Sequence, residues 1–105
     1  MSSVASLLTL LTKSGILVIL FSGRDETCRN LTQEWLIENG VHYDDLFMRP
    51  KNDNRKDSLV KKELYEQHIK ESYDVLFVLD DRNQVVDMWR KDLDLPCFQV
   101  NYGNF

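Results

Sequence analysis

The chain has 105 residues, of which 43% are hydrophobic and 29% are charged, and its formal net charge is −4. This length suits a single domain, and the composition is ordinary for a globular protein. The negative net charge argues against a broad basic surface for nucleic acid, although it leaves room for a small phosphate-binding pocket.

The cysteines and the N-terminal residues indicate where the protein works. Cys28 and Cys97 fit no metal-binding or redox spacing, so we expect two reduced thiols. The apolar residues 4–11 lack the preceding basic residue and the following small-residue cleavage site of a signal peptide. Lys13 and Gly15 end this stretch well short of the roughly 18 residues that a membrane span needs. We therefore expect a soluble, cytoplasmic protein with no membrane segment.

The first elements of the chain are predicted to be a helix and a strand. Apolar residues at helical spacing give the helix an inner face of Val4, Leu7, Leu8 and Leu11. Ser2 or Ser3 can cap this helix, and Gly15 stands where a glycine commonly ends one. The uninterrupted apolar run Ile16–Phe21 then predicts a buried strand.

A second helix and a short strand are expected next. The helix runs from about Glu26 to Asn39, and Gly40 ends it. Its predicted inner face contains Cys28, Leu31 and Trp35. The residues Leu46, Phe47 and Met48 predict a short strand, which Pro50 ends.

The second half of the chain begins with a polar loop and predicts two further helix–strand pairs. A helix is expected over about residues 57–70, with Val60, Leu64 and His68 on one side. Five apolar residues in a row, Val75–Leu79, predict a strand that is buried on both faces. Residues 83–90 then predict a helix with the buried stripe Val85, Val86 and Trp89, and residues 97–100 predict the last strand.

This alternation of helices and strands predicts an α/β fold. We expect a parallel sheet of about four strands, flanked by helices and joined by right-handed crossovers, in one domain over residues 1–105. One feature is unusual, because the chain opens with a helix. Doubly wound domains usually begin with their central strand.

Polar side chains are expected to converge at one edge of this sheet, because the carboxyl ends of parallel strands and the amino ends of the following helices share one rim. The residues concerned are Ser22-Gly23-Arg24 after one strand, Asp57 and Lys61 at the start of a helix, and Asp80-Asp81 after another strand. A hydroxyl, an arginine and a lysine can bind a phosphate, and two carboxylates can hold a divalent cation. The pattern therefore indicates a site for phosphate and Mg²⁺.

Each of these motifs also has a simpler interpretation. Asp81 could cap the helix that follows it. Ser22-Gly23 could be an ordinary turn, and Arg24 a solvated charge. Lys61 could belong to a solvated helix face, together with the two other lysines nearby.

Four longer segments carry a family resemblance. They are LFSGR, DNRKDSLVKKELYEQHI, DVLFVLDDRNQVVDMWR and PCFQVNYGNF, within about residues 16–105. They resemble the 3′-phosphatase domain of bacteriophage-type polynucleotide kinase-phosphatases, a branch of the haloacid-dehalogenase (HAD) phosphohydrolase superfamily. The resemblance implies a HAD-like, Rossmann-type fold in which Ser22 binds the transferring phosphoryl group. By the same resemblance, Arg24, Asp57 and Lys61 would position the phosphate, and Asp81, with Asp80, would help to bind Mg²⁺.

The first strand of that family is missing from this sequence. In the family it ends in an Asp-x-Asp pair, which supplies the nucleophile that forms an aspartyl-phosphate and a general acid/base. Asp44-Asp45 and Asp92-x-Asp94 follow no buried strand, so we interpret them as surface turns. The missing strand would be the central one, between Ile16–Phe21 and Val75–Leu79. We expect that these two strands pair directly or that a strand from another chain fills the gap.

Two functions are consistent with these features. The chain could be a partial phosphatase domain that hydrolyses 3′-phosphates at nucleic-acid ends with Mg²⁺, only when a partner chain supplies the nucleophile strand. A partner chain or self-association could close the sheet. Alternatively, it could be a non-catalytic module that binds a 3′-phosphorylated end, a nucleotide or a protein. No G-x-x-x-x-G-K-[ST] loop occurs in the chain, so we expect these 105 residues not to include the kinase half of such proteins.

Overall fold

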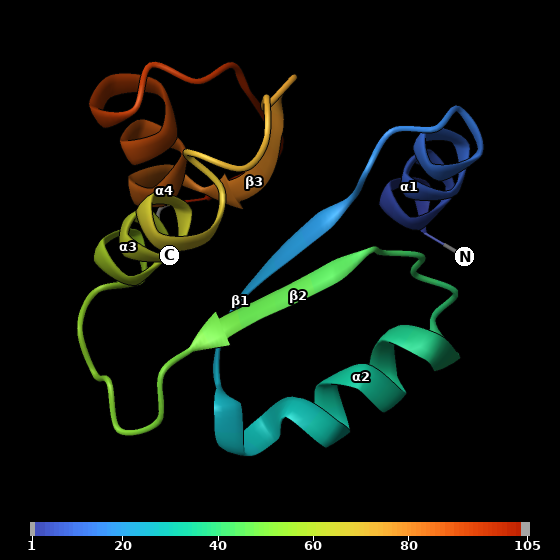
Figure 1. The fold of residues 1–105 in the computed structure, drawn as a ribbon, viewed down its shortest axis with the longest axis horizontal. Helices are drawn as coiled ribbons and strands as arrows, with labels where there is room; N and C mark the ends of the chain where they lie inside the picture. Colours follow the sequence, from blue (N-terminus) through green and yellow to red (C-terminus); the bar gives the residue numbers. More distant parts are fainter. Residues whose placement is uncertain (1, 104–105) are drawn as a thin grey trace. The chain divides into compact units, whose positions relative to one another are not determined.

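A computed structural model describes residues 2–103 of the chain. The chain divides into two compact units, Met1–Asp53 and Asn54–Phe105 (Figure 1). Each unit has its own pair of parallel strands. The predicted α/β fold with four parallel strands is confirmed. The expectation of one domain over residues 1–105 stays a prediction.

The first unit places a helix before a β-α-β arrangement. Its elements are α1 (Ser3–Lys13), β1 (Ile19–Asp25), the 3₁₀ turn η1 (Glu26–Cys28), α2 (Arg29–Glu38) and β2 (Asp45–Arg49). Ser2 caps α1 by accepting a hydrogen bond from the Ala5 amide at 3.1 Å. Gly15 and Gly40 follow α1 and α2 with φ of +82° and +67°, the left-handed conformation that glycine adopts without a steric penalty. Helix α2 packs on the strand pair, where Leu36 meets Leu46 and Met48.

Two predicted inner faces of the first unit are wrong in part. Helix α2 buries Thr32 and Leu36, whereas Leu31 and Trp35 are 63% and 56% exposed. Cys28 lies in the 3₁₀ turn rather than in the helix, so helical spacing counted from it selects the wrong face. In α1 the buried residues are Ala5 and Leu8, whereas Val4 and Leu7 are 37% and 38% exposed.

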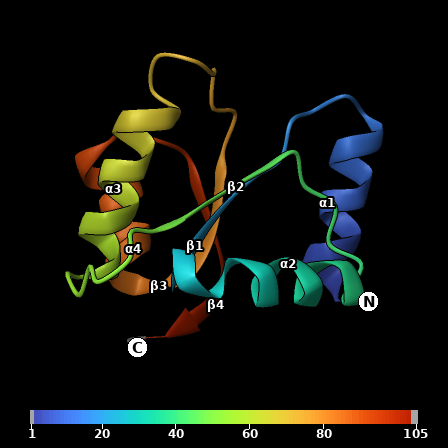
Figure 2. The ribbon, with the colours of Figure 1, turned by 60° about the horizontal axis from the view of Figure 1, so that its bottom comes forward.

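The second unit repeats the order of a helix followed by a β-α-β arrangement. Its elements are α3 (Asp57–His68), β3 (Val78–Arg82), α4 (Asn83–Asp87), the π-helix η2 (Met88–Asp92) and β4 (Cys97–Gly103). Figure 2 shows β4 beside β3. The predicted stripe Val85, Val86 and Trp89 is buried, and so are Val60 and Leu64 of α3. His68, predicted on the same side as Val60 and Leu64, is exposed. The buried residue at this end of α3 is its neighbour Ile69.

The first residues of the apolar runs 16–21 and 75–79 lie outside the strands that these runs were predicted to form. Strands β1 and β3 each start three residues later than predicted, and Leu17 and Leu76 are 59% and 61% exposed. Within the described residues each of these strands has a hydrogen-bonded neighbour on one edge alone. The prediction that these strands are buried is therefore wrong, since no residue of β1 or β3 is fully buried.

Each strand pair has an irregularity at the residues singled out in the sequence. The pairing of β1 with β2 shifts between Ser22 and Asp25, and that of β3 with β4 shifts between Asp80 and Arg82. Such bulges re-aim side chains at the end of a ladder. No helix within residues 2–103 has the length and apolar character needed to cross a membrane.

Candidate active site

A cluster of charged side chains in the second unit joins α3 to β3. The ammonium of Lys61 lies 3.3 Å from Asp57 Oδ2, one helical turn away, and 3.4 Å from Asp80 Oδ2. These three side chains are 11–12% exposed. Arg82 Nη1 adds a longer contact to Asp57, at 3.7 Å. The prediction that Lys61 belongs to a solvated helix face is therefore wrong, since its charge lies between two carboxylates.

The two acids of β3 are held in different ways. Both carboxylate oxygens of Asp80 have protein donors. Its Oδ1 accepts from the Asp81 amide at 2.8 Å, and its Oδ2 accepts from Lys61 and from the Trp89 indole at 3.1 Å. For Asp81 it is the backbone that is held, because Gln99 Nε2 donates to its carbonyl at 2.9 Å. Within residues 2–103 the Asp81 carboxylate accepts no hydrogen bond and forms no ion pair.

Asp81 does not cap the following helix. The N-cap position of α4 is Arg82, and no side chain makes a capping hydrogen bond there. The simpler interpretation of Asp81 is therefore wrong, and its half-buried carboxylate has no structural partner in the described chain.

This arrangement fits a magnesium ion in part. Mg²⁺ in proteins is commonly held by one or two carboxylates together with waters and substrate phosphate. The Asp81 carboxylate offers one such ligand, beside Asp80, whose two oxygens already have protein donors. In the part of the chain that the structure describes, no group of three or more His, Cys, Asp or Glu side chains could hold a metal ion by itself. Further ligands would have to come from solvent, substrate or another strand.

Ser22 and Arg24 lie in the first unit, within β1 rather than after it. The Ser22 hydroxyl oxygen accepts from the Arg24 amide at 3.1 Å, and Arg49 Nε of β2 donates to the Gly23 carbonyl at 2.7 Å. Arg24 is exposed, and its guanidinium has no partner among residues 2–103. The convergence of Ser22 and Arg24 with the acids of the second unit stays a prediction.

The other acidic pairs do not end strands. Asp44 is at a bend, where its Oδ2 accepts from the Val18 amide at 2.7 Å, and Asp45 begins β2. Asp92 ends the π-helix, and Asp94 follows it as an exposed residue. Neither pair has the position of a nucleophile at the end of a strand.

Sequence reasoning missed Trp89 and Gln99 as neighbours of the acids. The helical pattern marks Trp89 as a core residue, which is correct at 4% exposure, but it says nothing about where the indole N–H points. Gln99 follows its strand pattern without any motif of its own.

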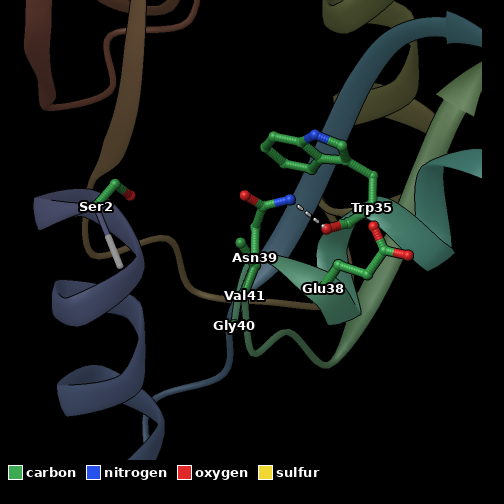
Figure 3. A pocket seen from close by; sticks show the side chains of 6 residues that line it. All are labelled: Ser2, Trp35, Glu38, Asn39, Gly40 and Val41. Atoms are coloured by element: carbon green, nitrogen blue, oxygen red, sulfur yellow. Dashed lines mark hydrogen bonds between the residues drawn. The ribbon is translucent and has the colours of Figure 1, made fainter.

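A pocket of about 470 Å³ in the first unit is lined by Ser2, Trp35, Glu38, Asn39, Gly40 and Val41 (Figure 3). The Asn39 amide donates to the Trp35 carbonyl at 2.8 Å at its edge. None of the six predicted site residues lines this pocket.

Comparison with known proteins identifies relatives over nearly the whole chain. Two solved structures titled "Structure of the Pnkp1/Rnl/Hen1 RNA repair complex" and "Structure of Pnkp1/Rnl/Hen1 complex" are 52% and 53% identical, with TM-scores of 0.96 and 0.94. The matches cover 99% and 97% of this chain, but only 33% and 35% of the chains in those structures.

A curated relative and a family model point to the same kind of protein as the solved structures. A "Putative bifunctional polynucleotide kinase/RNA ligase" of Autographa californica nuclear polyhedrosis virus is 38% identical over 81 residues, which are 76% of this chain and 12% of the viral protein. The chain thus spans about an eighth of that relative and about a third of the chains in the solved structures. The model of the polynucleotide kinase PNKP phosphatase domain matches residues 1–105, and the chain therefore belongs to that family of phosphatase domains.

Proposed function

We propose that this chain supplies the phosphate-binding and metal-binding residues of an Mg²⁺-dependent phosphatase that acts on 3′-phosphates at nucleic-acid ends. The proposal rests on one observation above all. Lys61 is held between Asp57 and Asp80, next to an Asp81 carboxylate that has no partner in the described chain. Family membership supports the reaction class, and the RNA repair complex named for the related structures supports RNA as the nucleic acid.

Each side chain has a role that follows from its chemistry. Lys61 and Arg24 neutralise and orient the phosphate, and the Ser22 hydroxyl donates to one of its oxygens. Asp57 keeps the Lys61 ammonium in place. Asp81, beside Asp80, would hold Mg²⁺, and the bound ion would supply positive charge to stabilise the phosphoryl oxygens.

The nucleophile is expected from a strand outside the elements described above. Strands β1 and β3 each have one neighbouring strand within the described residues, so each has an edge that can accept another. A partner chain could add that strand, whereas a second copy of this chain, which carries no strand ending in Asp-x-Asp, could close the sheet but not supply the nucleophile. The related structures are of a complex of several proteins, which supports a partner chain as its source. We place this activity in the cytoplasm, where the two free cysteines would stay reduced.

The test is a phosphatase assay with Mg²⁺ and a 3′-phosphorylated oligonucleotide. The chain is measured alone and with an added peptide or chain that carries a strand ending in Asp-x-Asp. We expect turnover in the complemented sample, and we expect Asp81→Asn to abolish it. A complemented sample that binds Mg²⁺ normally and remains inactive would contradict the proposal, as would turnover by the chain alone that Asp81→Asn removes.

A non-catalytic role is the second candidate, and it is favoured by the absence of an acidic pair at the carboxyl end of any strand other than β3 among the described residues. In this case the chain binds a 3′-phosphorylated oligonucleotide without turnover, even after complementation. Lys61→Ala should abolish that binding, because it removes the cation between Asp57 and Asp80.

A further inference from the structure

The indole of Trp89 contacts the acidic pair directly from within the hydrophobic core. Its Nε1 donates to Asp80 Oδ2 at 3.1 Å, and the same oxygen lies 3.4 Å from Lys61 Nζ. Trp89 is 4% exposed, so its ring is packed and its N–H is withdrawn from water. We propose that Trp89 is a positioning residue of the site, whose N–H fixes the Asp80 carboxylate against Lys61. This inference rests on the proposed function.

The ring of Trp89 is itself held in one orientation. It packs edge-on against Tyr65 of α3, with the ring centroids 6.1 Å apart and the planes at 83°. Trp89 is the second residue of the π-helix η2, which follows α4 without a break. A π-helical turn inside a helix changes the direction of its side chains and is frequent at functional sites. The donor is therefore rigid before any ligand arrives.

Trp89 also explains why two adjacent acids can have different tasks. With the indole and the ammonium on Oδ2 and the Asp81 amide on Oδ1, the Asp80 carboxylate cannot rotate without losing a partner. Gln99 holds only the backbone of Asp81, which leaves that carboxylate free to turn toward a cation. Groups that orient a metal site from behind typically change metal affinity about 10–100-fold when they are removed.

The decisive variant removes the N–H and keeps the ring. In a full chain carrying Trp35→Phe, Trp89 is the sole tryptophan and can be replaced by 3-benzothienylalanine, which has sulfur in place of the indole N–H. The Trp35→Phe chain with ordinary Trp89 is the matched control, and both chains are titrated together with the added strand that ends in Asp-x-Asp. We expect the analogue to lower the Mg²⁺ affinity about tenfold or more in calorimetric titration, with little change in melting temperature.

A second readout follows the hydrogen bond itself. In the Trp35→Phe chain the Trp89 indole N–H gives a single NMR signal, which we expect to move in Asp80→Asn and on addition of Mg²⁺. An indole signal that is unchanged in Asp80→Asn, or an analogue that binds Mg²⁺ as tightly as the control, would overturn the role of Trp89. A control chain that binds no Mg²⁺, or binds it equally well with Asp81→Asn, would instead overturn the proposed function and this inference with it.

Discussion

At the scale of single residues, Lys61 has the environment most sensitive to change. Removing its ammonium would leave the Asp57 and Asp80 carboxylates, both 11% exposed, without their shared cation. Because Trp89 and Arg82 still contact these acids, we expect Lys61→Met to lower the free energy of unfolding by about 2 kcal/mol. Urea denaturation measures this change.

The neighbouring lysine provides the control for that measurement. Lys62 lies 3.8 Å from Asp92, and the two side chains are 35% and 51% exposed. Solvent screens such a pair, so Lys62→Met should change stability by less than about 0.5 kcal/mol. Equal effects of the two substitutions would show that the cluster around Lys61 adds no stability of its own.

The two cysteines should differ in reactivity. Burial raises the pKa of the Cys97 thiol, and the nearby Asp80 charge raises it further, so this thiol stays protonated at pH 8. Cys28 is half-buried. We expect iodoacetamide at pH 8 to alkylate Cys28 well before Cys97, and mass spectrometry of the peptides measures the order. Equal rates in the folded chain would contradict the burial of Cys97.

At the scale of elements, Arg49 connects the end of β2 to the irregular part of β1. Its Nε donates to the Gly23 carbonyl at 2.7 Å, and its Nη1 donates to the Asp53 carbonyl at 3.1 Å. We expect Arg49→Met to loosen the Gly23-Arg24 segment, so that trypsin cleaves after Arg24 several times faster. Arg29→Met is the matched control, because Arg29 contacts Glu26 and the Leu46 carbonyl instead. If both variants are cleaved alike, Arg49 has no special hold on this segment.

Helix ends could be predicted from the sequence, whereas strand burial could not. Helix ends were predictable, because Ser2, Gly15 and Gly40 perform local tasks that depend on their own residue type. Strand burial was not, because it depends on which strands lie on either side. Val75–Leu79 has the apolar run of a central strand, yet β3 has one partner in the described chain and none of its residues is buried.

The candidate site was predictable where it depends on spacing. Asp57 and Lys61 are one helical turn apart, and the Lys61 ammonium also lies 3.4 Å from Asp80 Oδ2. The assignment of these residues to a phosphate and metal site stays a prediction. The hydrogen bond from Trp89 was not predictable, since apolar spacing reports burial and not the direction of one N–H.

At the scale of the whole molecule, the net charge of −4 limits how nucleic acid can bind. We expect affinity to depend on the terminal 3′-phosphate, with Arg24 and Lys61 as the principal cations. Two neutralised phosphates on a single strand give a slope of log affinity against log salt concentration of about −1.4. Titrations of fluorescent oligonucleotides at several salt concentrations measure it. A much steeper slope, with equal affinity for an unphosphorylated strand, would indicate a broad basic surface instead.

The fold of the second unit should depend on the number of residues in the π-helix η2. Lys91 is an exposed residue of this turn, and substituting its side chain should be harmless. Deleting it is different, because the loss of one residue would slide Cys97–Gly103 by one position along β3. Side chains alternate across a strand, so Gln99 would then face away from the Asp81 carbonyl that it now contacts. We expect a single-residue deletion at Lys91 to unfold the unit, as circular dichroism would show, whereas Lys91→Ala should leave it intact.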